Sequence, residues 1–148
     1  MESENLLELV DIEAGYGRAA LVLRGLTVKV PPSTIVCLVG PNGAGKSTVL
    51  KVASGMLVPR AGTISVQGKD VTGDGPQQML RHGLAHVLQG HSVFPEMTVA
   101  ENIKLGGFTV KDRSELNERI ERVKAVFPIV AERWDDLAGL LSGGQQKQ

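Results

Sequence analysis

The stretch "GPNGAGKST" at Gly40–Thr48 is the most informative part of the sequence, because it matches the pattern G-x-x-x-x-G-K-[ST]. Backbone N–H groups can surround a phosphate chain closely only where side chains do not block them, which explains the repeated glycine. The apolar run "TIVCLV" precedes this stretch, and a helical pattern starts at Lys46. The N-terminus of a helix attracts anions. We therefore predict a phosphate-binding loop here, rather than a glycine-rich turn that only joins a strand to a helix.

Several other segments have the patterns of strands. "LELVDIEAGYG" and "LRGLTVKV" read as two strands, and the second alternates between apolar and polar residues, as in a half-exposed antiparallel sheet. "GTISVQG" is a further short alternating strand. "TIVCLV" is continuously apolar, which favours a strand buried on both faces of a parallel sheet, with Cys37 as a small buried residue. "LAHVL" at Leu84–Leu88 is also strand-like.

Helical patterns occur in four segments. The third starts with the capping box Thr98-x-x-Glu101, and the fourth places apolar residues at i, i+4, i+7 and i+11 on one face. The predicted helices run from Lys46 up to Gly55, from Pro76 to His82, from Thr98 to Leu105 and from Ser114 to Phe127. We therefore expect an antiparallel β and α/β part over residues 1–90, followed by a helical part over residues 91–148.

The composition is that of one globular domain of 148 residues, with 42% hydrophobic and 22% charged residues. Lys plus Arg equals Asp plus Glu at 16 each, so no net charge favours nucleic acid or an anionic membrane surface. The acidic N-terminus does not resemble a secretory signal. No aliphatic run approaches the roughly 20 residues that span a bilayer. We expect a cytoplasmic protein, or one attached to a membrane only through partners.

"GPNGAGKST" followed by "LSGGQ" at Leu141–Gln145 resembles the ATP-binding cassette, the ATPase domain of ABC transporters. The interval between the two motifs fits a transporter cassette, whereas a long coiled coil separates them in cassette-type chromosome and repair ATPases. The resemblance covers nearly the whole chain. It implies an α/β P-loop NTPase fold of the ABC type, with an N-terminal antiparallel β subdomain and an inserted α-helical subdomain.

This resemblance also implies ATP and Mg²⁺ as cofactors and assigns roles to individual residues. Tyr16 is similar to the aromatic residue that stacks on adenine, although a strand-end aromatic that packs on the core is the alternative. Lys46 and Gln89 are the implied catalytic residues, and Ser47 and Gln89 are the implied Mg²⁺ ligands. The signature residues of one cassette are expected to meet the γ-phosphate that a second cassette holds. The implied nucleotide-binding residues are Tyr16, Gly40, Pro41, Asn42, Gly43, Ala44, Gly45, Lys46, Ser47, Thr48, Ser142, Gly143, Gly144 and Gln145.

The helical part is similar to the smaller ATPase subunit of branched-chain amino acid importers, through "LGGF" and "RIERVKAVFPIVAERW". One departure is Gln89, since that subunit often has Glu there. The implied partners are a second ATPase subunit, transmembrane permease subunits and, indirectly, a substrate-binding protein, at the cytoplasmic face of the cell membrane and without nucleic acid. The alternatives are a urea or other amide importer, a lipopolysaccharide-type exporter, a soluble cassette ATPase that acts on ribosomes, and an inert truncated fragment.

A complete cassette continues beyond its signature, with an apolar strand that ends in Asp-Glu and then a histidine loop. No such sequence follows Gln148, so by resemblance the chain covers about the first 60% of a cassette, and the C-terminal part of the core is missing. The parent protein is expected to be an ATPase whose hydrolysis is coupled to transport. The chain alone is expected to be inactive, because it lacks the carboxylate that orients the attacking water.

Overall fold

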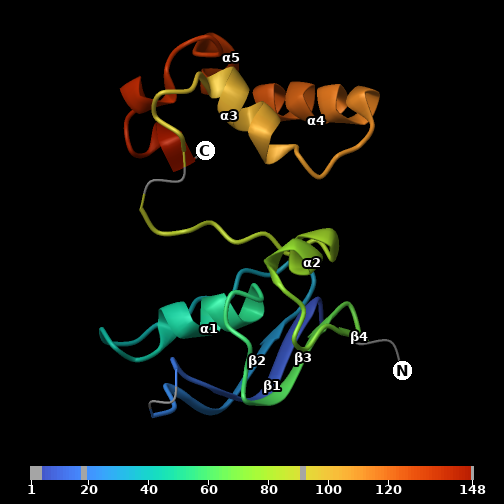
Figure 1. Ribbon diagram of the computed structural model, residues 1–148, viewed down its shortest axis with the longest axis vertical. Coiled ribbons are helices and arrows are strands. Elements are labelled where there is room, and N and C mark those ends of the chain that lie inside the picture. Colours follow the sequence, from blue (N-terminus) through green and yellow to red (C-terminus); the bar gives the residue numbers. More distant parts are fainter. Residues whose placement is uncertain (1–4, 18–19, 91–92, 148) are drawn as a thin grey trace. The chain divides into compact units, whose positions relative to one another are not determined.

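The computed structural model describes residues 5–17, 20–90 and 93–147. The chain forms two compact units, Met1–His86 and Val87–Gln148 (Figure 1). The first unit contains a sheet with helices, and the second is helical. None of the helices in the described part of the chain is long and apolar enough to cross a membrane.

An antiparallel sheet with the strand order β2-β1-β3-β4 organises the first unit. Its strands are β1 (Leu7–Ala14), β2 (Leu23–Val30), β3 (Ala61–Val66) and the two-residue β4 (Lys69–Asp70). Leu9 on β1 is opposite Val28 on β2 and Ile64 on β3. The alternation in β2 is confirmed, since Leu26, Val28 and Val30 are half-buried while the residues between them are exposed. The predicted antiparallel strands are therefore correct.

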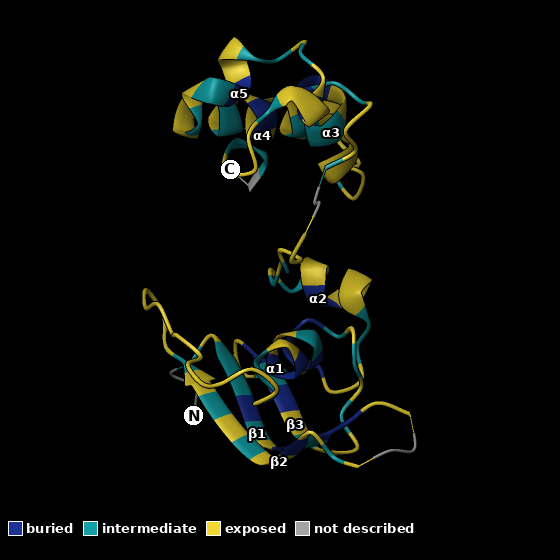
Figure 2. Ribbon diagram, turned by 90° about the vertical axis from the view of Figure 1, so that its left-hand side faces the viewer, coloured by how far each residue is buried: buried dark blue, intermediate teal, exposed yellow. Residues whose placement is uncertain are grey.

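Helix α1 (Lys46–Ala53) lies against the sheet with a buried face, as Figure 2 shows. It contributes Val49, Val52 and Ala53 to the core. The short helix α2 (Pro76–Arg81) adds Met79. The buried core residues of this unit are Leu9, Ile12, Ala14, Leu23, Val49, Val52, Ala53, Ile64, Val66, Val71 and Met79. This core fixes the start of α1 against the sheet, which matters for the site described below.

Two predicted strands are wrong. Residues 34–39 and 84–88 have no regular secondary structure. Ile35 is 95% exposed and Val39 93% exposed, and Cys37 is exposed rather than buried. A strand exists only through hydrogen bonds to a neighbouring strand. Among the described residues, the sheet contains only β1–β4. Both segments are rich in apolar residues, but no strand in the described part of the chain pairs with them.

In the second unit, the helices predicted over Thr98–Leu105 and Ser114–Phe127 are present, with each end displaced by one residue. The short helix that begins at Pro128 and the 3₁₀ turn before the signature were not predicted. The elements of this unit are α3 (Val99–Gly106), α4 (Arg113–Val126), α5 (Pro128–Glu132) and the 3₁₀ turns η1 (Ala138–Leu140) and η2 (Gln145–Lys147). The capping box at Thr98 is confirmed, with both reciprocal hydrogen bonds present. Asp112 caps α4 by accepting a hydrogen bond from the N–H of Ser114 at 2.7 Å. Pro128 ends α4 but also begins α5, as proline suits the first turn of a helix.

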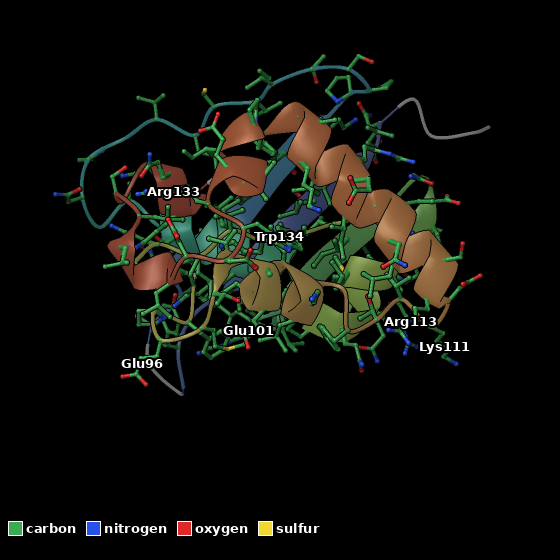
Figure 3. All side chains as sticks on the ribbon, turned by 90° about the horizontal axis from the view of Figure 1, so that it is seen from above. Glu96, Glu101, Lys111, Arg113, Arg133 and Trp134 are labelled. Atoms are coloured by element: carbon green, nitrogen blue, oxygen red, sulfur yellow. The ribbon has the colours of Figure 1, made fainter. Side chains whose placement is uncertain are left out.

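Trp134 joins the helices of this unit. Its side chain is labelled in Figure 3. The ammonium of Lys124 on α4 lies 4.1 Å from the centroid of the Trp134 ring, and that of Lys104 on α3 lies 5.9 Å away. The carbonyl of Trp134 accepts a hydrogen bond from the N–H of Ala100 at 2.9 Å. Backbone bonds between Val99 and Asp136 and between Ala138 and Met97, each 2.9 Å, continue this attachment. The segment that precedes the signature is therefore fixed to the start of α3.

Candidate functional site

The loop at residues 40–45 leads into α1 with the geometry of a phosphate-binding loop. It has no strand or helix of its own, and its residues are exposed except for the half-buried Gly45. Gly45 is the N-cap of α1 in the left-handed conformation, with φ +91°. Gly43 has φ +85°. Residues with a side chain rarely adopt these angles. These two glycines therefore allow the chain to turn sharply and direct the start of α1 toward solvent.

The ammonium of Lys46 is held by the loop itself. Its Nζ donates hydrogen bonds to the carbonyl oxygens of Gly40 at 2.8 Å and Pro41 at 2.7 Å. The chain thus curls so that carbonyls five and six residues earlier face the ammonium. Neutral carbonyls are weaker partners for a cation than phosphate oxygens are. The arrangement places the Lys46 ammonium beside the N-terminal, positive end of the α1 dipole. A phosphate chain bound there would be attracted by both.

Tyr16 is attached to the same helix from the far end of β1. Its hydroxyl lies 3.3 Å from the hydroxyl of Thr48, which is only 4% exposed. The ammonium of Lys51 lies over the Tyr16 ring, 5.2 Å from its centroid. The hydrogen bond with Thr48, followed by the proximity of Lys51, lowers the pKa of the Tyr16 hydroxyl. Since 45% of the Tyr16 surface remains exposed, the ring is available to a ligand, and it does not pack into the core.

The remaining predicted site residues belong to the second unit. Gln89 is exposed in an irregular segment. In the signature, the N–H of Ser142 donates to Oε1 of Gln145 at 2.9 Å, and the N–H of Gln145 donates to Oγ of Ser142 at 3.3 Å. This confirms the predicted capping box, which opens the turn η2. Ser142, Gly143 and Gly144 are exposed, while Gln145 is half-buried. The structure brings Tyr16 together with Thr48 in the first unit, while Gln89 and the signature form part of the other unit.

The residues present can hold Mg²⁺ only in part. Ser47 offers an exposed hydroxyl in the first turn of α1, next to Lys46. Mg²⁺ binds oxygen ligands and commonly takes several of them from water and substrate phosphates. Among the described residues, no group of three or more His, Cys, Asp and Glu side chains is arranged to hold a metal ion. Ser47 therefore fits Mg²⁺ that arrives with a nucleotide, and not a site built from carboxylates.

Two residues with clear structural roles were missed by the sequence analysis, Lys51 and Asn102. Asn102 accepts a hydrogen bond from the N–H of Phe94 at 2.8 Å and donates to the carbonyls of Phe94 at 3.0 Å and Thr98 at 2.9 Å. It thus fixes the loop that precedes α3. Asparagine is a poor helix former, and its position inside the capped helix was the signal available in the sequence. Lys51 lies three residues after Thr48 on α1, so helical spacing could have placed both beside Tyr16.

Comparison with known proteins gives the family. A family model described as ABC transporter matches residues 23–148. A crystal structure of a nucleotide-free ATP-binding cassette from an ABC transporter is similar, with a TM-score of 0.81 and 27% identity over 96% of this chain and 61% of that one. The chain belongs to the ABC transporter family, and its fold is that of the family's P-loop ATP-binding cassette.

Two curated relatives show how far the similarity extends. The chain is 34% identical over 142 residues to the high-affinity branched-chain amino acid transport ATP-binding protein BraG of Pseudomonas aeruginosa, which covers 96% of this chain and 60% of that protein. It is also 34% identical over 156 residues to the Fe(3+) ions import ATP-binding protein FbpC of Photorhabdus laumondii subsp. laumondii, which covers 100% of this chain and 41% of that protein. The chain therefore spans less than two thirds of the length of either relative.

Proposed function

We propose that this chain is the ATP-binding part of a transport ATPase, in which the loop at residues 40–45 and the start of α1 hold the phosphates of ATP. The observation that carries this proposal is the position of Lys46, whose ammonium is held at 2.7 Å and 2.8 Å from two carbonyls of that loop. A bound triphosphate offers charged oxygens instead, and hydrogen bonds between charged groups are the stronger ones. The N–H groups at the start of α1 add further donors.

The other site residues have distinct proposed roles around the nucleotide. Tyr16 stacks on the adenine, which agrees with its exposed ring and its attachment to α1. Ser47 and Gln89 provide oxygen ligands for Mg²⁺, which supplies positive charge beside the phosphates and aids hydrolysis as an electrophile. Gln89 also orients the attacking water. The signature residues Ser142–Gln145, in the second unit, bind the γ-phosphate held by a second cassette.

The proposed cargo is a branched-chain amino acid, imported through permease subunits at the cytoplasmic face of the membrane. BraG, a protein named for branched-chain amino acid transport, is 34% identical to this chain over 142 residues, and the segments "LGGF" and "RIERVKAVFPIVAERW" resemble the smaller ATPase subunit of such importers. Uptake of labelled leucine and of labelled Fe³⁺ by cells that lack the parent gene tests the assignment. Loss of iron uptake alone would contradict it.

We further propose that the loop before α3 contacts a cytoplasmic helix of the permease subunits. Phe94 is 58% exposed there, while Val93 and Met97 are half-buried beside it. Asn102 fixes the backbone on both sides of Phe94 through the hydrogen bonds described above. An exposed aromatic residue on a rigid loop can bind a partner with little loss of conformational entropy.

Crosslinking tests this contact. Cys37 is exposed, so it is first replaced by alanine, and a single cysteine is then introduced as Phe94→Cys or, as the matched control, as Glu132→Cys on an exposed position of α5. Crosslinks to the permease subunits are expected from position 94 and not from position 132. The reverse pattern would place the partner on another face.

Binding of ATP tests the central part of the proposal. The variant Lys46→Ala removes the ammonium, and Lys69→Ala removes an exposed lysine on β4 as a control for lost charge. ATP affinity is expected to fall in Lys46→Ala and to stay equal to that of the unsubstituted chain in Lys69→Ala. Equal affinity in all three proteins would refute the assignment of the phosphate loop.

A further inference from the structure

Two residues of α1 hold the side chain of Tyr16. Thr48 lies 3.3 Å from the Tyr16 hydroxyl, and Lys51, one turn later on the same helix, has its ammonium 5.2 Å from the ring centroid. One attachment is at the hydroxyl and the other is over the ring, so together they limit both the position and the tilt of the ring. A single hydrogen bond would leave the ring free to rotate about the hydroxyl.

This arrangement links the ring to the phosphate loop through one rigid element. Helix α1 begins at Lys46, and its inner face is buried, with Val52 completely inaccessible to solvent. The distance between the ring and the start of α1 is therefore fixed by the helix. A fixed distance between the Tyr16 ring and the start of α1 suits a nucleotide, because its base and its phosphates must bind at the same time.

Lys51 also determines which part of the ring a ligand can reach. A cation over one face of an aromatic ring is attracted by the negative potential of that face. The ammonium occupies that side, and 45% of the Tyr16 surface is still exposed. The face opposite Lys51 is therefore the one that can stack on a flat, neutral, aromatic ligand.

We propose that Lys51 is a positioning residue for the base of the bound nucleotide: it holds one face of the Tyr16 ring, with Thr48 holding the hydroxyl, so that the other face accepts a purine. This inference rests on the proposed binding of ATP at the phosphate loop. It adds a residue that touches neither phosphate nor base and that acts only through Tyr16.

The first test compares two ligands, ATP and inorganic tripolyphosphate, which has the phosphates but no base. Lys51→Gln keeps an unbranched side chain of similar helix propensity, one atom shorter, and removes its charge. Loss of one exposed cation–π contact predicts that ATP binds about two- to fivefold more weakly. Tripolyphosphate is expected to bind Lys51→Gln with the same affinity as it binds the control variant Lys69→Gln. Lys51→Arg, which retains a cation over the ring, should restore the affinity for ATP.

The second test needs no ligand, because Tyr16 is the only tyrosine of the chain. The pH titration of tyrosinate absorbance therefore reports Tyr16 alone. The contacts with Thr48 and Lys51 favour the ionised hydroxyl, so Thr48→Val and Lys51→Gln are each expected to raise the pKa of Tyr16 above that of the parent. Thr48→Val should give the larger increase, since its hydrogen bond is the main cause of the lowered pKa.

The outcomes separate this inference from the proposed function. If Lys51→Gln weakens ATP and tripolyphosphate equally, Lys51 attracts phosphates or stabilises α1, and a role in positioning the base is refuted. An unchanged affinity for ATP, or an unchanged pKa of Tyr16 in Lys51→Gln, refutes it as well. If the parent binds neither ligand, the proposed function itself fails, and the inference fails with it.

Discussion

Replacement of Gly45 by alanine tests the geometry of the phosphate loop most sharply. Gly45 has φ +91°, and a non-glycine residue in the left-handed region costs about 1–2 kcal/mol. A Cβ at this position would also lie 3.0 Å from Cδ2 of Leu23 and 3.2 Å from Cγ1 of Val22. Leu23 is 4% exposed and belongs to the core, so it cannot move away freely. Such overpacking typically costs about 1–3 kcal/mol more.

Gly43→Ala is the matched control, because Gly43 has φ +85° and a Cβ added at this position would have no neighbouring atom within 4 Å. Its cost should be the conformational part alone, about 1–2 kcal/mol. Unfolding of both variants and the parent in urea, followed by circular dichroism, gives the two losses of stability. We expect Gly45→Ala to be the more destabilised by about 1–3 kcal/mol. Equal destabilisation, or a smaller effect at Gly45, would show that the loop is not held against Leu23 as described.

Further predictions concern the base, the second unit and catalysis. Tyr16→Ala should weaken ATP binding while Tyr16→Trp largely preserves it, because stacking needs an aromatic face and not a hydroxyl; equal loss in an equilibrium titration would count against stacking. Thr98→Ala should destabilise the second unit by about 0.5–2 kcal/mol, measured by the fluorescence of Trp134, the only tryptophan, during unfolding in urea. The pKa of the Glu101 carboxyl is lowered, mainly by the hydrogen bond from the N–H of Thr98. The ionised carboxylate therefore stabilises the fold above the unfolded pKa of about 4.3, and this stabilisation is lost as the pH falls through the folded pKa. The difference in unfolding free energy between the unsubstituted chain and Glu101→Gln should disappear at low pH, and a difference that persists there would contradict this. The 148-residue chain alone should release no phosphate from ATP above background in a steady-state assay, and turnover that disappears in Lys46→Ala would overturn that expectation.

The parts of the fold that depend on local sequence were predictable. The alternation in β2, the capping box at Thr98 and the apolar face of α4 around Ile120 all appear in the structure as expected. Each depends on residues within one element or one turn. The interactions that stabilise these features lie within a few residues of one another, so the sequence alone was enough to predict them.

The two segments wrongly predicted as strands show where local reasoning fails. Residues 34–39 have the composition of a buried strand, yet Ile35 and Val39 are almost fully exposed. The cause is that a strand of this kind needs partners on both edges and cover on both faces. Whether partners exist is a property of the rest of the fold, and hydrophobicity along 34–39 does not encode it. The prediction of a buried Cys37 failed for the same reason.

The candidate site was predictable in its motifs but not in its supporting contacts. The loop around Lys46 has a fixed spacing, so the sequence indicated its residues directly. Tyr16 meets Thr48 across 32 positions of the chain, and Asn102 reaches back to Phe94 across 8. Contacts of this kind depend on how β1, the loops and the helices fold together. The signals for Lys51 and Asn102, helical spacing from Thr48 and an asparagine inside a capped helix, were present in the sequence but are common, so they did not single out these residues.

The most direct test of the proposed phosphate site at Lys46 is a comparison of the dissociation constants of ATP for the unsubstituted chain and for Lys46→Ala. Both are measured by isothermal titration in the presence of Mg²⁺. A hydrogen bond to a charged group contributes about 1.5–3 kcal/mol, so loss of the ammonium should weaken binding at least about tenfold. Lys69→Ala should bind ATP as the parent does. If Lys46→Ala binds ATP as tightly as the parent, the loop at residues 40–45 is not the phosphate site and the account is wrong.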